Sequence, residues 1–484
     1  MTQPHELSAC EQAEAIRSGE LGPVELVEHA LGRIERLDPE VAAFVTVTPE
    51  RALAAAREAQ RRLTATTDHR ELPPLLGVPT AIKDLCATAG VRTTFGSAVY
   101  QDYVPEVDDD SARLLAEAGA ISLGKTAVPE FGLPPYTEPA SRPATVTPWD
   151  RRLLAGGSSG GAGAAVAAGM VAFAHGTDGG GSIRIPASVC GLVGLKTSRG
   201  LVSRGPLGGD PSGMSVSGPI ARSVEDAAAM LDALAVPVAT EPFARPVPPG
   251  TGFLERARRA DPGRLRIGRY RTPLIPGVEV DRACLMAYEK AGALLAELGH
   301  DVTDAPPAVG EEEIGGFVAV FETLWAVLAH GNPVPPGGEH LLLPLTRWWR
   351  ERGAKISGPE YLAAAMAAQN AARRVIAAHA RFDVVLTPTL ALPPRPVGWF
   401  TESGDPAQDY LRQQQFTPFT SIYNITGQPA LTLPLYWTDP TPEHPVLPIG
   451  VQLVGQPGAD ALLLELGATL QQIAPWSDRH PPGW

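Results

Sequence analysis

Two glycine-rich stretches decide the interpretation of this chain: Gly157-Ser158-Ser159-Gly160-Gly161 and Gly176-Thr177-Asp178-Gly179-Gly180-Gly181-Ser182-Ile183-Arg184-Ile185-Pro186-Ala187. Glycine lets the backbone adopt positive φ and approach a ligand closely, so amide N–H groups can point at a developing negative charge. A lysine lies upstream, in Gly77-Val78-Pro79-Thr80-Ala81-Ile82-Lys83-Asp84. Two serines on such turns, together with a lysine, indicate acyl transfer.

Lysine is the base that these motifs offer. A serine hydroxyl is a weak nucleophile until a neighbouring group removes its proton, and the quoted stretches contain no histidine. Lys83 can accept that proton only as a neutral amine, so we expect burial to lower its pKa from the usual value of about 10.4. The residues themselves therefore favour a buried lysine that activates a serine.

Two local patterns match other functions, and their context argues against both. Gly119-Ala120-Ile121-Ser122-Leu123-Gly124-Lys125-Thr126 fits the phosphate-binding P-loop, but a helical stretch precedes it where a strand is needed. Ser159 fits the nucleophile elbow of α/β-hydrolases, yet Arg151-Arg152-Leu153-Leu154-Ala155 is too short and basic for the buried strand that an elbow requires. We expect a turn between helix and strand at Gly119, and a tightly packed helix over 161–169.

Most of the chain alternates short apolar runs with helical stretches, which is typical of an α/β protein with a buried sheet. The first 65 residues are helical in pattern: Ser8 can cap one helix, Pro23 begins a second, and a third covers 49–62. We predict an N-terminal helical layer over 1–65 and a catalytic domain over 66–484, which together form a single domain.

Composition argues against several classes of function. The 484 residues carry 40 basic and 53 acidic side chains, a net charge of −13, without a long basic run, so we expect no nucleic-acid partner. Neither an N-terminal signal segment nor a run of about 18 apolar residues is recognisable, so we expect no membrane span. No CxxC pair occurs, which argues against a zinc site and disulfides and predicts a reduced, cytoplasmic setting.

The combined spacing of the motifs is more specific than any single one. Ser158 and Ser182 lie 24 positions apart, downstream of the lysine motif, and this combination resembles the amidase signature family. The similarity continues through 191–197, 218–227, 424–430 and 447–455, so it covers nearly the whole chain. It implies an α/β fold with a large mixed β-sheet sandwiched by helices. The stretches 129–133, 137–139 and 417–420 look most like bacterial amidases of the 6-aminohexanoate cyclic-dimer hydrolase and aryl acylamidase type.

The resemblance also implies roles for individual residues. Ser182 is the nucleophile, Ser158 is a bridging serine that follows a cis peptide bond, and Lys83 is the base. Four backbone amides form the implied oxyanion hole: Gly179, Gly180, Gly181 and Ser182. Four more residues orient the turns: Ser159, Thr177, Asp178 and Arg184. Three aromatic residues are candidate walls of a substrate pocket, although packing alone is the competing explanation for each: Tyr136, Trp149 and Trp325.

The predicted function is hydrolysis of carbon–nitrogen bonds in small amides through an acyl-enzyme, without metal or organic cofactor. Esters and carbamates are further candidate substrates, because the same amide donors serve all three carbonyls. One alternative is the glutaminase component of a tRNA-dependent amidotransferase, and another is a non-catalytic binding protein on the same scaffold. The expected partner is a small-molecule amide, and a homodimer remains open.

Overall fold

The N-terminal layer contains the three helices predicted for it. The computed structural model describes residues 3–484 apart from 141, 209, 246–251 and 443. Ser8 caps the first helix: its hydroxyl accepts the Glu11 N–H, and the Glu11 carboxylate accepts the Ser8 N–H. A strand that the sequence analysis did not predict separates the second and third helices. The elements are α1 (Ala9–Ser18), α2 (Pro23–Val41), β1 (Phe44–Val47) and α3 (Pro49–Ala65).

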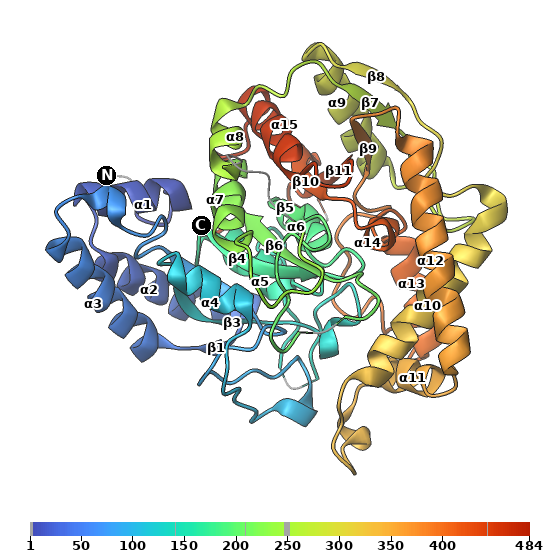
Figure 1. Cartoon of the computed structure of the whole chain (residues 1–484), viewed down its shortest axis with the longest axis horizontal. Helices are drawn as coiled ribbons and strands as arrows, with labels where there is room; N and C mark the ends of the chain where they lie inside the picture. Colours follow the sequence, from blue (N-terminus) through green and yellow to red (C-terminus); the bar gives the residue numbers. More distant parts are fainter. Residues whose placement is uncertain (1–2, 141, 209, 246–251, 443) are drawn as a thin grey trace.

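The large mixed sheet that we predicted is present (Figure 1). Among the described residues it has eight strands in the order β4-β6-β5-β10-β11-β9-β7-β8. Neighbours are antiparallel from β4 to β9, whereas β9, β7 and β8 run parallel. The strands are β4 (Phe173–Asp178), β5 (Val193–Lys196), β6 (Val216–Ala221), β7 (Arg266–Arg269), β8 (Asp301–Asp304), β9 (Val384–Pro388), β10 (Ala430–Trp437) and β11 (Pro448–Gly455).

A second, three-stranded sheet has the order β1-β3-β2, in which β2 (Pro79–Lys83) and β3 (Ile121–Thr126) are parallel. Strand β3 lies inside the pattern that imitates a P-loop, and helix α4 (Asp110–Glu117) precedes it, as expected for a turn at Gly119. Strand β2 contacts β4, the edge strand of the large sheet. The end of β2 therefore lies next to the end of β4.

Helices cover both faces of the large sheet. Phe173 and Ala174 are neighbours in β4, so their side chains point to opposite faces. Phe173 belongs to the core shared with α7, α9 and α15, and Ala174 to the core shared with α2, α5 and α6. The helices are α5 (Gly160–Ala167), α6 (Arg184–Cys190), α7 (Val224–Leu234), α8 (Phe253–Arg259), α9 (Arg282–Glu297), α10 (Ile314–Gly331), α11 (Pro344–Gly353), α12 (Gly358–His379), α13 (Pro406–Phe416), α14 (Ile422–Thr426) and α15 (Asp460–Ile473).

Helix α5 shows why the chain needs small residues there. Every residue of α5 is buried. A Cβ atom on Gly161 would lie 2.3 Å from Ala127 N and 2.4 Å from Ala43 O, distances that no side chain can occupy. Close packing against these two backbone segments therefore places the start of α5, and the Ser158–Ser159 turn before it, against the small sheet.

Helix α10 is unusually apolar. With the residues just before it, the span Glu311–Gly331 has the length and hydropathy of a membrane-crossing helix, which the sequence had not led us to expect. In the structure α10 packs against α11 and α12, on the side of the molecule opposite the N-terminal helices (Figure 1). Its Phe317, Phe321 and Trp325 line a cavity. This cavity and the contacts with α11 and α12 account for part of its apolar composition.

Candidate active site

Lys83 lies at the end of β2 and is completely buried. Its Nζ donates to Ser158 Oγ at 2.9 Å, to Thr177 Oγ1 at 2.8 Å and to the Thr177 carbonyl at 3.1 Å. Burial lowers the pKa of Lys83 well below its usual range, with the Asp178 carboxylate opposing the shift and Arg204 adding to it. The geometry thus gives a lysine that can be neutral and that points at a serine hydroxyl.

Ser158 lies in the turn that leads into α5, and the Gly157–Ser158 peptide bond is cis. Two glycines allow this turn to pack closely. A Cβ atom on Gly157 would lie 2.6 Å from Tyr136 N, and one on Gly132 would lie 3.1 Å from Ser158 Oγ. The Ser158 side chain is almost completely buried, so its hydroxyl contacts protein groups rather than bulk solvent.

Ser159 and Thr177 tie the two turns together. Ser159 Oγ donates to the Thr177 carbonyl at 3.2 Å and accepts the Thr177 N–H at 3.4 Å, and Ser159 N donates to the Ser182 carbonyl at 3.3 Å. The Ser159 hydroxyl is therefore used in bonding to β4. This arrangement differs from a nucleophile elbow, in which the serine hydroxyl must be presented to the substrate.

Ser182 follows the end of β4 in the turn before α6. Asp178 shapes this turn: its carboxylate accepts the Gly181 N–H at 2.8 Å and the Ile183 N–H at 3.1 Å. The Gly181 amide is thus already bonded, which corrects its proposed place in the oxyanion hole. Gly181 has φ +139°, and a Cβ atom there would lie 2.6 Å from Thr420 Oγ1, so this position requires glycine.

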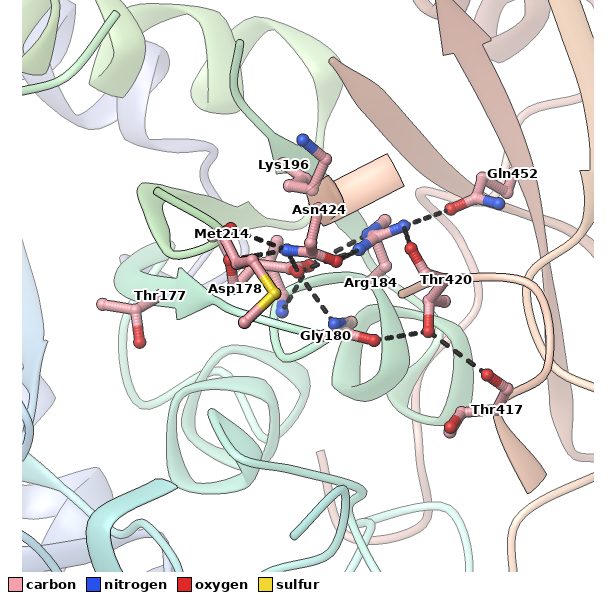
Figure 2. A network of polar contacts seen from close by, with 12 residues as sticks. Thr177, Asp178, Gly180, Arg184, Lys196, Met214, Thr417, Thr420, Asn424 and Gln452 are labelled. Carbon is pink, nitrogen blue, oxygen red and sulfur yellow. Dashed lines mark hydrogen bonds and ion pairs between the residues drawn. The ribbon is translucent and has the colours of Figure 1, made fainter. Parts of the chain in front are cut away.

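A buried network of hydrogen bonds holds the Asp178 carboxylate in place (Figure 2). Arg184 donates to it through Nε and Nη2, both at 2.9 Å, and Asn424 Nδ2 donates to it at 2.8 Å. Burial would raise the pKa of Asp178, but the charge and hydrogen bonds of Arg184 outweigh that effect and hold it below the usual range. The Asp178 carboxylate therefore stays ionised beneath the Ser182 turn.

Three residues of this network were not singled out from the sequence. Arg184 Nη1 donates to Gln452 Oε1 at 2.6 Å and to the Thr420 carbonyl at 2.8 Å, and Thr420 Oγ1 donates to the Gly180 carbonyl at 2.6 Å. Asn424 and Gln452 lie in stretches that carried the family resemblance, and Thr420 lies in one that carried the subgroup resemblance. Their position in matching motifs was the available signal, but nothing local connects them to Ser182 across more than 230 residues.

A cavity opens in front of Ser182. Of Lys83, Ser158 and Ser182, only Ser182 is among its described lining residues, and the Ser182 hydroxyl has no hydrogen-bond partner in the described part of the chain. None of the described lining residues is charged at neutral pH. The apolar walls include Leu133, Leu274, Ile275, Phe317, Phe321, Trp325 and Tyr410, and the polar ones include Gln413, Gln414, Thr417 and Ser421.

The three aromatic candidates for the pocket wall have different positions. Trp325 lines the cavity and stacks on Phe321 with 5.3 Å between ring centroids. Trp149 does not line it: its Nε1 donates to the Cys190 carbonyl at 2.8 Å and its ring packs on Trp437. Tyr136 is also absent from the wall, because its ring stacks on Phe400 in the core. Neither Trp149 nor Tyr136 therefore forms a wall of the cavity that contains Ser182.

Comparison with known proteins identifies the family. The family model described as Amidase matches residues 25–464. This chain belongs to the amidase family. It is 39% identical to the putative amidase AmiB2 of Mycobacterium tuberculosis over 481 residues, 98% of this chain and 97% of that protein. It is also 34% identical to a glutamyl-tRNA(Gln) amidotransferase subunit of Chloroflexus aggregans, with 99% of each protein covered.

Solved structures agree with the subgroup that the sequence indicated. This amidase is similar to 6-aminohexanoate cyclic dimer hydrolase complexed with substrate, with a TM-score of 0.89, 32% identity and 99% of each chain covered. It is also similar to a bacterial aryl acylamidase of the amidase signature family, with a TM-score of 0.84, 26% identity and 98% of each chain covered. The predicted fold and family are therefore confirmed. Within the described residues, no cluster of His, Cys, Asp and Glu is arranged to hold a metal ion.

Proposed function

We propose that this amidase hydrolyses small neutral amides through an acyl-enzyme intermediate on Ser182. One observation carries the assignment of roles. Lys83 Nζ lies 2.9 Å from Ser158 Oγ inside the protein, and Ser182 is the member of the three that faces the cavity. A buried base bonded to a second hydroxyl, with a third hydroxyl on the cavity wall, is the arrangement that nucleophilic catalysis needs.

The proton would move from Ser182 to Ser158 and on to Lys83 as the Ser182 oxygen attacks the substrate carbonyl. A lysine with a lowered pKa can accept this proton because it is already neutral. The protonated Lys83 then returns the proton along the same path to the leaving nitrogen, and the C–N bond breaks. Water, deprotonated by the same relay, attacks the acyl-enzyme and releases the acid.

The amides of Gly179, Gly180 and Ser182 are the proposed donors to the oxyanion. These N–H groups have no partner within the described residues, whereas that of Gly181 donates to Asp178. Preorganised donors of this kind contribute about 10²–10³ in rate each. The carbonyl of an ester or a carbamate develops the same charge, so both remain candidate substrates.

The glutaminase alternative is less well supported by the cavity. Free glutamine carries an α-ammonium and an α-carboxylate, and burying either charge without a partner is costly. The described residues of the cavity wall provide no charged partner. We therefore favour a self-sufficient amidase, and we propose a cytoplasmic location, with which the free thiols of Cys10, Cys86, Cys190 and Cys284 agree.

Covalent labelling and a substrate panel test this proposal. A fluorophosphonate should label the wild type and fail to label Ser182→Ala, while Ser159→Ala keeps the label because the Ser159 hydroxyl is bonded to Thr177. Aryl, aliphatic and cyclic amides, with matching esters and carbamates, should be hydrolysed without added protein partners. Labelling that persists in Ser182→Ala would exclude Ser182 as the nucleophile. Glutamine hydrolysis that requires partner proteins would favour the amidotransferase.

A further inference from the structure

One polar side chain on the cavity wall is held in a single orientation by the protein. Gln413 lies on α13, is 6% exposed and lines the cavity together with Ser182 and Trp325. Helix α13 turns Tyr410, Gln413, Gln414 and Thr417 toward the cavity, as the helical repeat requires for positions i, i+3, i+4 and i+7. A buried amide needs a partner for each of its polar atoms.

Asp409 determines the orientation of the Gln413 amide, because it binds the NH₂ end of that group. Gln413 Nε2 donates to Asp409 Oδ1 at 2.8 Å, and the Tyr136 hydroxyl donates to Asp409 Oδ2 at 2.5 Å. An ionised carboxylate only accepts hydrogen bonds, so the NH₂ group of Gln413 must face it. Burial raises the pKa of Tyr136 well above its usual value, with the Asp409 charge adding to the effect, so the phenol remains a donor.

The carboxylate in turn is stabilised by these two donors. Burial raises the pKa of Asp409, and the hydrogen bonds from Tyr136 and Gln413 oppose that rise. Asp409 is 4% exposed and borders a different cavity from the one that contains Ser182, which separates the NH₂ side of Gln413 from the substrate.

The oxygen of the amide is the atom left for the active-site cavity. Gln413 Oε1 accepts no hydrogen bond from the described residues, and it is not among their buried atoms that lack a partner. Gln413 lines the cavity and its Nε2 is turned to Asp409, which leaves Oε1 as the amide atom available to a substrate there. An apolar substrate that displaces water from it leaves the acceptor unpaired unless the substrate brings a donor.

We propose that Gln413 Oε1 accepts a hydrogen bond from an N–H group of the substrate and thereby selects secondary carboxamides over esters of the same acid. Gln413 is then a specificity residue, and Asp409 and Tyr136 are positioning residues that keep its oxygen toward the cavity. This inference rests on the proposed amide hydrolysis at Ser182. A site built around a substrate N–H disfavours the analogue that lacks it, because the buried acceptor then has no partner.

A pair of substrates with the same acyl group tests the proposal: an acyl anilide, which has an N–H, and the phenyl ester, which has none. The measured quantity is the ratio of kcat/KM for the anilide to kcat/KM for the ester at pH 8, since the ratio cancels general losses of activity. In Gln413→Met, which keeps the length of the side chain without the acceptor, we expect the ratio to fall by about 10-fold or more. Gln415→Met is the matched control, because Gln415 is exposed on the same helix and does not line the cavity.

Asp409→Asn provides a second variant that leaves Gln413 in place. An asparagine can donate or accept, so both orientations of the Gln413 amide become available and the ratio should also fall. An unchanged ratio in folded Gln413→Met, or an equal fall in Gln415→Met, would overturn the proposal. Failure of the proposed function looks different, because then the wild type hydrolyses neither substrate, or Ser182→Ala hydrolyses both.

Discussion

The buried ion pair beneath the Ser182 turn makes a quantitative prediction for Asp178→Asn. Asp178 and Arg184 are both fully buried, and the carboxylate receives Arg184 Nε and Nη2 at 2.9 Å each. In the variant an NH₂ group replaces one carboxylate oxygen and faces N–H groups that also donate, so neither side accepts. The Arg184 guanidinium then keeps a buried charge without an anionic partner. Breaking a buried pair by changing one partner costs about 3–5 kcal/mol.

The expected change in Tm follows from the size of the chain. At about 2.1 cal/mol/K per residue, 484 residues have an unfolding entropy of about 1 kcal/mol/K, so Tm should fall by about 3–5 °C in scanning calorimetry. Asp383→Asn, which breaks the more exposed pair with Arg266, is the control and should shift Tm by less than about 1 °C. The Tm of the double variant Asp178→Asn/Arg184→Met should fall by less than the sum of the falls in the two single variants. A Tm of Asp178→Asn within about 1 °C of the wild type would refute the reasoning.

Three further predictions concern the nucleophile, its base and the cavity. Lys83→Met should lower kcat by about 10²–10⁴ with little change in Tm. Because burial lowers the pKa of Lys83, kcat/KM of the wild type should rise with pH along a limb centred well below 10.5. The free energy of unfolding of the wild type, relative to that of Lys83→Met, should rise toward pH 10.5, because the unfolded chain still holds the proton that folded Lys83 has released. An ascending limb that persists in Lys83→Met would contradict this. Gly181→Ala should lower both Tm and kcat, because its Cβ would lie 2.6 Å from Thr420 Oγ1, whereas Gly180→Ala, with only Phe321 at 3.6 Å, should keep the wild-type Tm. Trp325→Ala should raise KM for aryl acyl substrates by about 10-fold, and equal KM values would remove Trp325 from the binding wall.

Local patterns predicted the elements well where the cause is local. Ser8 caps α1 through its own turn, and Pro23 begins α2, because both effects depend on neighbouring backbone groups. Strand β1 was missed because the four residues Phe44–Val47 become a strand only by pairing with β3, more than 70 positions away. The Gly181 amide was misassigned because the sequence does not say which N–H the Asp178 carboxylate will take.

The sequence alone predicted which serines and which lysine react and that glycine-rich turns carry the serines, because these short motifs depend only on residues a few positions apart. Tertiary structure alone decided that Lys83 from the small sheet meets Ser158 and Thr177 at the edge of the large one. It also decided that Gln413 donates its NH₂ group to Asp409 and that Trp149 lies away from the cavity. The reason is physical: a pKa depends on desolvation, and an orientation depends on a partner, and both are supplied by segments far away in the sequence.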